Sequence, residues 1–236
     1  MILKNKMNIA IIPARKNSRR IKNKNIKIFN GKPIIYWSIK TALNSKLFNE
    51  VFVSTDSKKI AQLANKYGAK SLYPRPSNLS DDYTTIINVI KFEIKNLEYQ
   101  KIKFNNICCI FPAAPFLKVK HLLRGFKVLK KKNFKGFVFG ADELPKSNLR
   151  SFYFQKNKLN LIKSNFKNTR TQDLPKTYVD AGQFYWGSKK LWKKENNVFI
   201  KDSNILLLPR SEVFDIDNFS DLKAARRHAK KLKKIK

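Results

Sequence analysis

Cysteine, histidine and glycine are scarce in this chain, and its hydrophobic runs are short. The 236 residues include two cysteines, two histidines and seven glycines, and none has the spacing of a metal site. Cys108 and Cys109 are adjacent, so they point to opposite faces of a strand, and we interpret them as small buried hydrophobic residues rather than a disulfide. No apolar run approaches the ~20 residues that cross a bilayer. Because Met7–Pro13 is too short for a signal peptide, the sequence predicts a cytoplasmic protein without a membrane segment.

Acidic residues are scarce as well. The chain has 16 Asp and Glu against 51 Lys and Arg, which gives a net charge of +35. A nucleic-acid-binding surface would explain this charge. A compositional bias toward Lys, Asn, Ile and Phe explains it equally well, since the lysines are spread along the whole chain. We favour the bias and expect the positive field to speed the association of anionic substrates.

Apolar segments of strand and helix character alternate along the chain, which predicts an α/β fold with a largely parallel sheet. The expected strands lie at 7–13, 50–54, 70–73, 106–111, 136–141, 181–187 and 205–209. The expected helices lie at 33–44, 58–67, 82–99, 118–132 and 220–232. From Glu143 to about Pro175 the alternation stops, and we expect hairpins or an excursion from the main sheet there.

A cationic loop directly follows the first expected strand. Six of the eleven residues from Arg15 to Asn25 are Lys or Arg. Such a loop at the end of a buried strand suits polyphosphate binding, because its charges repel one another unless an anion lies among them. The loop does not have the P-loop pattern. The alternative is a solvated charge run. The candidate phosphate-binding residues are Arg15, Ser18, Arg19, Lys24 and Asn25.

Two carboxylates stand at alternating positions near the C-terminus, in Asp215-Ile216-Asp217. In an extended segment they lie on one face, the arrangement with which a hard cation such as Mg²⁺ reaches phosphate oxygens. Acidic pairs also cap helices, and Asp221 would serve that purpose. Because the chain has only 16 acidic residues, we favour the metal interpretation.

Two further groups are candidates for binding. Arg75 could clamp a phosphate or a base, or it could brace the loop that contains Asp81 and Asp82. The segments Asn168–Asp173 and Tyr178–Gly187 combine hydroxyl, amide, guanidinium and carboxylate groups with aromatic residues. Such groups suit a sugar acid, and an ordinary strand with a polar entry loop is the alternative.

Five segments in order make the chain resemble the nonulosonic acid cytidylyltransferases, the family that makes CMP-sialic acid and its relatives. The resemblance covers Ile9 to about Leu222. The segments are Ile12–Ser18 with Lys24-Asn25, Val53–Asp56, Arg75-Pro76 with Leu79–Asp82, Pro112–Pro115, and Asp215–Asp217. Thr169–Leu174 together with Asp180–Trp186 most resembles the pseudaminic acid branch.

The resemblance implies a Rossmann-like nucleotidyltransferase domain over residues 1–236, with about 143–180 forming an arm that builds a homodimer and contributes to sugar binding. It implies that CTP and a nonulosonic acid give CMP-sugar and pyrophosphate with Mg²⁺, serving glycosylation of flagellin or other surface structures. The implied catalytic residues are Arg15, Lys24, Asp215 and Asp217, with the two aspartates as metal ligands. The implied nucleotide-binding residues are Ala14, Arg15, Ser18, Arg19, Lys24, Asn25, Arg75, Asp82, Phe111 and Pro112. The implied sugar-binding residues are Arg170, Gln172, Asp180, Gln183 and Tyr185.

Several positions depart from the family pattern. Phe111 stands where sialic acid members tend to have a Gln that reads cytosine, so stacking or backbone groups must read the base here. Ala113 and Ala114 replace usual hydroxyl residues, and Val179 replaces a histidine frequent in the pseudaminic branch. Three hypotheses follow: the reaction on pseudaminic acid, the same reaction on N-acetylneuraminic, legionaminic or 3-deoxy-octulosonic acid, and a basic nucleic-acid-binding protein. We favour the first and consider nucleic acid an improbable partner, because the aromatic residues mostly occupy core-periodic positions.

Overall fold

A seven-stranded sheet forms the centre of the molecule in the computed structural model, which describes residues 7–234. The strand order is β11-β7-β10-β6-β1-β4-β5, and the neighbouring pairs are parallel except for the two that involve β10. The bounds are β1 Asn8–Pro13, β4 Glu50–Ser54, β5 Lys70–Leu72, β6 Asn106–Ile110, β7 Val138–Glu143, β10 Tyr178–Ser188 and β11 Asn204–Leu207. The expected α/β fold with a mostly parallel sheet is confirmed.

Helices cover both faces of this sheet, as the near-continuous apolar strands require. Along β1 the side chains alternate: Ala10 and Ile12 pack with α1, α2 and α4, whereas Ile9 and Ile11 pack with α3 and α5. The bounds are α1 Ile34–Asn44, α2 Lys58–Lys66, α3 Ile86–Tyr99, α4 Val119–Lys131 and α5 Lys189–Lys194. None of the helices within residues 7–234 is long and apolar enough to span a bilayer.

Helix α3 starts later than the sequence predicts. It begins at Ile86 rather than at residue 82 or 83. Thr85 is its N-cap, and Thr85 Oγ1 accepts the Asn88 N–H at 3.3 Å. Asp81 Oδ1 accepts the backbone N–H groups of Tyr83 and Thr84, at 3.0 and 2.6 Å. These bonds fold residues 81–84 into a loop before the helix.

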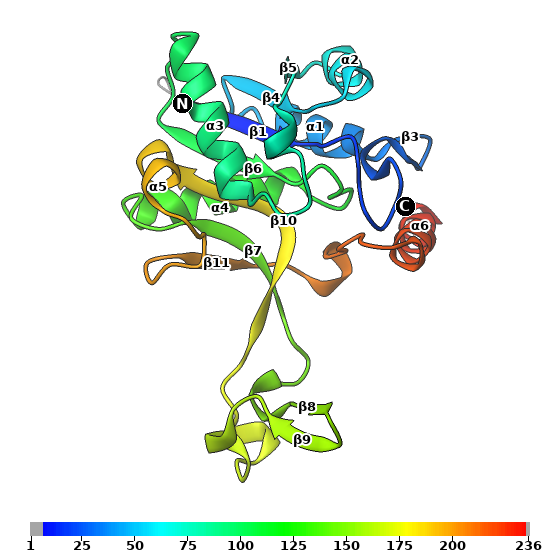
Figure 1. Cartoon of the computed structure of the whole chain (residues 1–236), viewed down its shortest axis with the longest axis vertical. Coiled ribbons are helices and arrows are strands. Elements are labelled where there is room, and N and C mark those ends of the chain that lie inside the picture. The colour runs from blue at the N-terminus through cyan, green and yellow to red at the C-terminus, as the bar shows by residue number, and fades with distance from the viewer. Residues whose placement is uncertain (1–6, 235–236) are drawn as a thin grey trace.

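An arm, defined here as residues 144–177, projects away from the body (Figure 1). Strands β7 and β10 pair antiparallel at its root, with Tyr178 opposite Glu143. The arm contains the hairpin of β8 (Phe152–Gln155) and β9 (Lys158–Leu161). It also has three 3-10 turns, η3 Asn148–Arg150, η4 Ser164–Phe166 and η5 Thr171–Asp173. The expected excursion between Glu143 and Pro175 is confirmed.

A third apolar cluster joins the cationic loop to the C-terminal helix α6 (Phe219–Lys234). It combines Ile21 of the cationic loop with Ile216, which stands between the two candidate metal ligands, and both are buried. The remaining members are Phe29, Ile34, Phe116, Leu222, Ala225 and Ala229. Strands β2 (Ile28–Phe29) and β3 (Lys32–Pro33) and turn η1 (Lys24–Ile26) complete this region, with turns η2 (Ser77–Leu79) and η6 (Arg210–Glu212) elsewhere. The two charged segments are therefore anchored to one hydrophobic unit.

Candidate active site

A cavity of about 810 Å³ opens where β1 and β6 end. In open α/β sheets, ligands bind at the carboxyl ends of the strands. Strand β10 runs the opposite way, so its first half reaches the same edge, where the Phe111 N–H donates to Gln183 O at 2.9 Å. The cavity is lined by Pro13, Arg15, Ser18, Arg19, Arg20, Lys24, Asn25, Asp82, Phe111, Pro112, Ala113, Gly182 and Asp215. Most of the predicted nucleotide-binding residues are thus brought together, along with Asp215.

Buried polar contacts fix the cationic loop at both ends. The Ala14 N–H donates to Ser54 O at 2.8 Å, and Ala14 itself is fully buried at the end of β1. Asn25 Nδ2 donates to Arg15 O at 2.9 Å and closes the loop. Asn25 Oδ1 is buried without a hydrogen-bond partner among the described residues. This free acceptor on the cavity wall suits a hydroxyl donor or a cation.

Three of the loop cations, Arg15, Arg20 and Lys24, lie close to carboxylates of the same chain. Arg15 Nη2 lies 2.5 Å from Asp82 Oδ1, and Arg15 Nη1 donates to Asp81 O. Arg20 Nη2 lies 2.7 Å from Asp217 Oδ1. An anionic ligand therefore competes with existing ion pairs.

Asp215 and Asp217 lie on either side of the buried Ile216. Lys24 Nζ donates to Ile216 O at 2.8 Å and lies 3.6 Å from Asp217 Oδ1. Asp215 faces the concave cavity, and partial burial in its wall, together with the charge of Asp217, raises the pKa of Asp215. Gly182 lies beside this carboxylate at φ +59°, a backbone conformation that favours glycine, and an added Cβ would make an ordinary contact with Asp215 Cγ at 3.7 Å.

The two aspartates fit a divalent cation that arrives with phosphate. Residues 7–234 contain no group of three or more His, Cys, Asp or Glu side chains that could hold a metal. Asp215 and Asp217 raise each other's free energy when both are charged, which a cation between them would relieve. Two carboxylates with phosphate and water oxygens make the ligand set that Mg²⁺ takes at nucleotide sites. The donor set fits such a metal.

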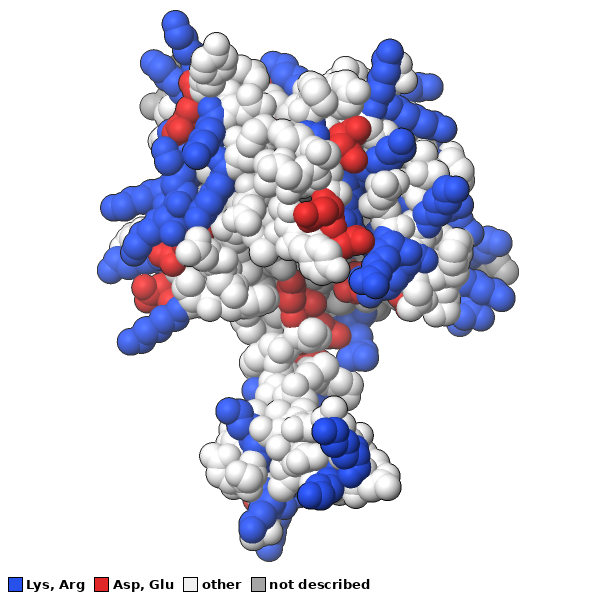
Figure 2. Space-filling view, in the orientation of Figure 1, with Lys and Arg blue, Asp and Glu red and all other residues white. Residues whose placement is uncertain are grey.

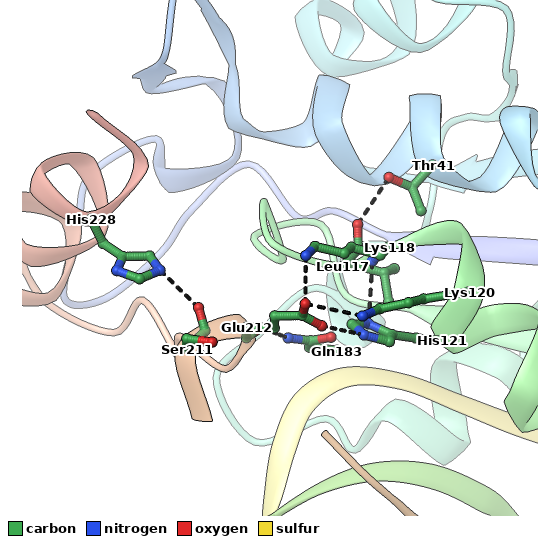
Figure 3. Close-up of polar contacts among 9 residues, drawn as sticks. All are labelled: Thr41, Leu117, Lys118, Lys120, His121, Gln183, Ser211, Glu212 and His228. Atoms are coloured by element: carbon green, nitrogen blue, oxygen red, sulfur yellow. Dashed lines mark hydrogen bonds and ion pairs between the residues drawn. The ribbon is translucent and has the colours of Figure 1, made fainter. Parts of the chain in front are cut away.

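A buried ionic cluster holds the segment that leads to these aspartates (Figure 3). Glu212 accepts from His121 Nε2 at 2.6 Å, from Lys120 Nζ at 3.2 Å, and also from Lys118 Nζ. Although burial raises the pKa of Glu212, these three hydrogen bonds lower it to about 2. The Lys118 N–H donates to His121 Nδ1 at 3.3 Å, which assigns the proton of the neutral ring to Nε2. Burial lowers the pKa of His121, consistent with that neutral ring.

Two backbone contacts complete this support. Gln183 Nε2 donates to Glu212 O at 2.6 Å, and His228 Nε2 lies 2.8 Å from Ser211 O. Turn η6 is thus held by α4, β10 and α6 together. Sequence reasoning missed Glu212 and His121. These two residues contact each other in the fold but lie 91 positions apart in the chain. The available signal was an acid two residues after Arg210, which is too weak to identify a site.

The predicted sugar-binding residues of β10 line up behind the cavity rather than inside it. Gln183 is 1% exposed and Tyr185 is 7% exposed. Tyr185 Oη donates to Asp180 Oδ2, and Asp180 Oδ1 accepts the Gly182 N–H at 3.1 Å. Burial raises the pKa of both Asp180 and Tyr185. Asp180 is the partly exposed member of this group.

Arg75 lies in a second cavity of about 230 Å³ that shares Pro13, Arg15 and Asp82 with the first. Its side chain is buried, and Nε donates to Ser80 Oγ at 3.0 Å. Burial lowers the pKa of Arg75. Arg75 therefore braces the 77–84 segment through Ser80, whereas Arg15 is the residue that pairs with Asp82.

Arg170 and Gln172 are exposed on the arm, far from the cavity of their own chain (Figure 1). The segment is ordered by Arg150, whose Nη2 donates to Thr171 Oγ1 at 2.8 Å. The structure thus places these two residues apart from the other candidate site residues.

A mostly parallel α/β sheet with a cationic loop and an aspartate pair at its carboxyl edge defines the class of nucleotidyltransferases. The chain belongs to the cytidylyltransferase family, whose family model matches residues 9–231. Cytidylyltransferases of this type commonly use a divalent metal ion.

Three similar proteins extend this assignment. A pseudaminic acid cytidylyltransferase of Campylobacter jejuni subsp. jejuni serotype O:2 is 40% identical over 220 residues, covering 93% of this chain and 94% of that protein. A CMP-N,N'-diacetyllegionaminic acid synthase of the same organism is 29% identical over 217 residues, covering 91% and 92%. A solved CMP:2-keto-3-deoxy-manno-octonic acid synthetase complexed with CTP has a TM-score of 0.69 at 14% identity, covering 95% and 99%, and shares the fold.

Proposed function

We propose that this chain transfers CMP from CTP to pseudaminic acid and releases pyrophosphate. The observation that carries the proposal is the cavity at the carboxyl edge, where the cationic loop faces Asp215 beside Asp217. The anomeric hydroxyl oxygen of the sugar attacks the α-phosphorus, and its proton is released to water. The bond from that phosphorus to the bridging oxygen of the β-phosphate breaks, and pyrophosphate leaves with the bonding electrons.

The cationic loop binds the triphosphate. Arg15, Arg19 and Lys24 supply positive charge where negative charge grows on the transferred phosphate, and Ser18 and Asn25 supply neutral hydrogen-bonding groups. Lys24 is well placed for this role, because its contact with Ile216 O holds the ammonium group between the loop and the aspartate pair.

Asp215 and Asp217 hold Mg²⁺. When bound, this ion neutralises charge on the phosphate oxygens and polarises the α-phosphate. The protein's own contribution is to fix both carboxylates: Ile216 is buried between them, and the Asp217 N–H donates to Asp221 Oδ2 at 2.9 Å. Asp221 thus holds the 215–217 segment by its backbone, a contact that does not use the side chains of Asp215 and Asp217.

The cytosine ring occupies the smaller cavity beside Arg75 and Asp82. The two cavities are adjacent, because Pro13, Arg15 and Asp82 line both, and a nucleotide that separates the Arg15–Asp82 pair can reach into each. Phe111 and Pro112 form the apolar wall facing the nucleoside, with Ala14 behind it. The absence of a side-chain amide at position 111 leaves base reading to Arg75 and the backbone of residues 80–84.

The sugar lies against Asp180 and Gly182 of β10, with Gln183 and Tyr185 shaping the wall from behind. Arg170 and Gln172 reach a sugar only in another copy of the chain, so we propose a homodimer built by the arms. Large apolar side chains exposed on the arm support this assembly, since one chain leaves them uncovered. They are Phe152, Tyr153, Phe154, Leu159 and Ile162.

Pyrophosphate release with CTP and Mg²⁺ tests the proposed function. Pseudaminic, legionaminic and N-acetylneuraminic acids are offered in separate reactions with the purified chain. Release with pseudaminic acid alone is expected. Release only with another acid would keep the reaction and overturn the sugar assignment, and release with none of the three would contradict the proposal.

A further inference from the structure

Arg20 contacts a candidate metal ligand, and the roles proposed above do not use this contact. Its Nη2 atom lies 2.7 Å from Asp217 Oδ1, and Lys24 Nζ lies 3.6 Å from the same oxygen. The side chain of Arg20 also lines the 810 Å³ cavity together with Arg15 and Arg19. Arg20 therefore lies within reach of both the metal ligand and the proposed triphosphate site.

The two partners of this ion pair differ in how firmly they are held. The backbone of Asp217 is fixed by Asp221 and by the buried Ile216. The side chain of Arg20 is 63% exposed, whereas that of Asp217 is 29% exposed. Because Ile21 anchors the loop immediately after Arg20, the guanidinium can leave Asp217 by side-chain rotation without a change in the loop backbone.

We propose that Arg20 occupies the place of the divalent cation beside Asp217 until nucleotide binds, and that its guanidinium then pairs with the triphosphate. The proposal rests on the metal role given to Asp217 above. A cation 2.7 Å from Oδ1 opposes the approach of a second cation to that oxygen. Phosphate offers the guanidinium an alternative with paired hydrogen bonds. Metal and CTP therefore favour each other's binding, and the metal binds weakly on its own.

Mn²⁺ titration without nucleotide tests this exchange directly, with free Mn²⁺ followed by electron paramagnetic resonance. The Arg20→Gln variant removes the competing charge, and it should bind Mn²⁺ about two- to fivefold more tightly than the unaltered chain, an effect in the range of an exposed ion pair. Arg20→Lys keeps the charge and should bind nearly as weakly as the unaltered chain. Lys16→Gln is the matched control, because Lys16 is an exposed cation of the same loop and lines neither cavity.

CTP titration in the presence of EDTA measures the other half of the exchange. Arg20→Gln should bind CTP several-fold more weakly than the unaltered chain, because the triphosphate loses one guanidinium partner. An unchanged CTP affinity would show that the Arg20 guanidinium does not pair with the triphosphate, and this would overturn the proposal. A misfolded variant would lose both affinities, whereas the exchange predicts a gain for Mn²⁺ and a loss for CTP.

The Asp217→Asn variant separates this inference from the proposed function. If Asp217→Asn abolishes Mn²⁺ binding while Arg20→Gln fails to tighten it, or if Lys16→Gln tightens it equally, the role of Arg20 is wrong and the metal assignment stands. If Asp217→Asn binds Mn²⁺ unchanged, both the metal assignment and the role of Arg20 are wrong.

Discussion

The carboxyl edge of the sheet and the arm differ in whether their functional side chains have partners within the chain. At the edge, the charged groups are paired within the chain: Arg15 with Asp82, Arg20 with Asp217, and Glu212 with its three donors. On the arm, the large side chains Phe152 and Phe154 are 60% and 69% exposed, and residues 7–234 leave most of their surface uncovered. The edge is built to exchange internal partners for a ligand, whereas the arm is built to gain partners from outside.

The distribution of charge follows the same division. Lys and Arg side chains occupy both flanks of the visible face of the body, and acidic side chains also appear near its centre (Figure 2). The arm carries cations beside its uncharged surface (Figure 2). A net charge of +35 opposes the association of two copies, so in the proposed dimer the apolar contact between arms must outweigh this repulsion. Association should therefore strengthen as salt screens the repulsion.

The largest expected effect is a loss of activity when the proposed metal ligand Asp217 at the carboxyl edge is replaced. Replacing Asp217 with Asn should lower kcat about 10²- to 10³-fold, because the metal loses a charged ligand. Asp217 keeps its backbone contacts, so the melting temperature should change little. Initial rates of pyrophosphate release and calorimetry check both. The control is Asp202→Asn, an exposed acid that lines neither cavity, and equal loss of activity in both variants would contradict the assignment.

The next largest effect is a loss of self-association when the apolar face of the arm is altered. Phe154→Asp places a charge on the exposed apolar face and should weaken self-association about thirtyfold or more, as expected when a buried aromatic contact is lost. Sedimentation at several protein concentrations measures this. Tyr99, 88% exposed on the body, provides the control Tyr99→Asp. An unaltered chain that stays monomeric at all concentrations would refute the proposed dimer.

A smaller effect concerns the buried ion cluster behind the edge. The folded pKa of Glu212, about 2, lies below the ordinary value of 4.5, so its stabilisation is present above pH 4.5 and is lost as the pH falls toward 2. Glu212→Gln should lower the free energy of unfolding by about 1–2 kcal/mol at pH 7.

Urea unfolding across this pH range checks that prediction. The difference in stability between the unaltered chain and Glu212→Gln should shrink as the pH drops from 4.5 toward 2, because in this range the carboxylate takes up a proton in the unfolded chain while it stays ionised in the native one. The control Glu50→Gln removes an exposed ion pair with Lys70 and should show a much smaller difference. A difference that grows toward low pH would reverse the sign and exclude the ionised state of Glu212.

The smallest expected effect is a stabilisation of the β8–β9 hairpin in the arm. Lys156 and Asn157, at φ 51° and 57°, form a two-residue turn between the paired residues Gln155 and Lys158. This conformation favours Asn-Gly. Lys156→Asn with Asn157→Gly should therefore stabilise the hairpin by about 0.5 kcal/mol. Slower amide exchange confined to β8 and β9, with no change in the body, would be the expected result, and faster exchange would contradict it.

Local sequence signals predicted the elements that local forces determine. The apolar run at β1, the helix expected at 58–67 and the loss of alternation after Glu143 all correspond to features of the structure. The start of α3 was misplaced because Thr85 caps the helix just before Ile86, and Asp81 holds the backbone of Tyr83 and Thr84 in a loop. The direction of β10 could not be read, because strand direction depends on how the chain returns from the arm.

The site was predicted in its parts but not in its pairings. The cationic loop and the aspartate pair each had a local signature, and the structure places them together. The contacts of Arg20 with Asp217 and of His121 with Glu212 join residues about 200 and 91 apart, and such pairings leave no trace in local spacing. Gln183 and Tyr185 also looked like ligand-facing residues, although the irregular register after Asp180 packs them behind the cavity.

Strand β10 connects the arm to the part of the sheet that borders the cavity. Its first residues pair with β7 at the root of the arm, and its later residues pair with β6 in the middle of the sheet. The irregular register between Asp180 and Tyr185 separates these two stretches, so a residue gained or lost on the arm side need not shift the strand inside the sheet. Evolution can therefore lengthen, shorten or recompose the arm as a replaceable module while the catalytic edge keeps its alignment.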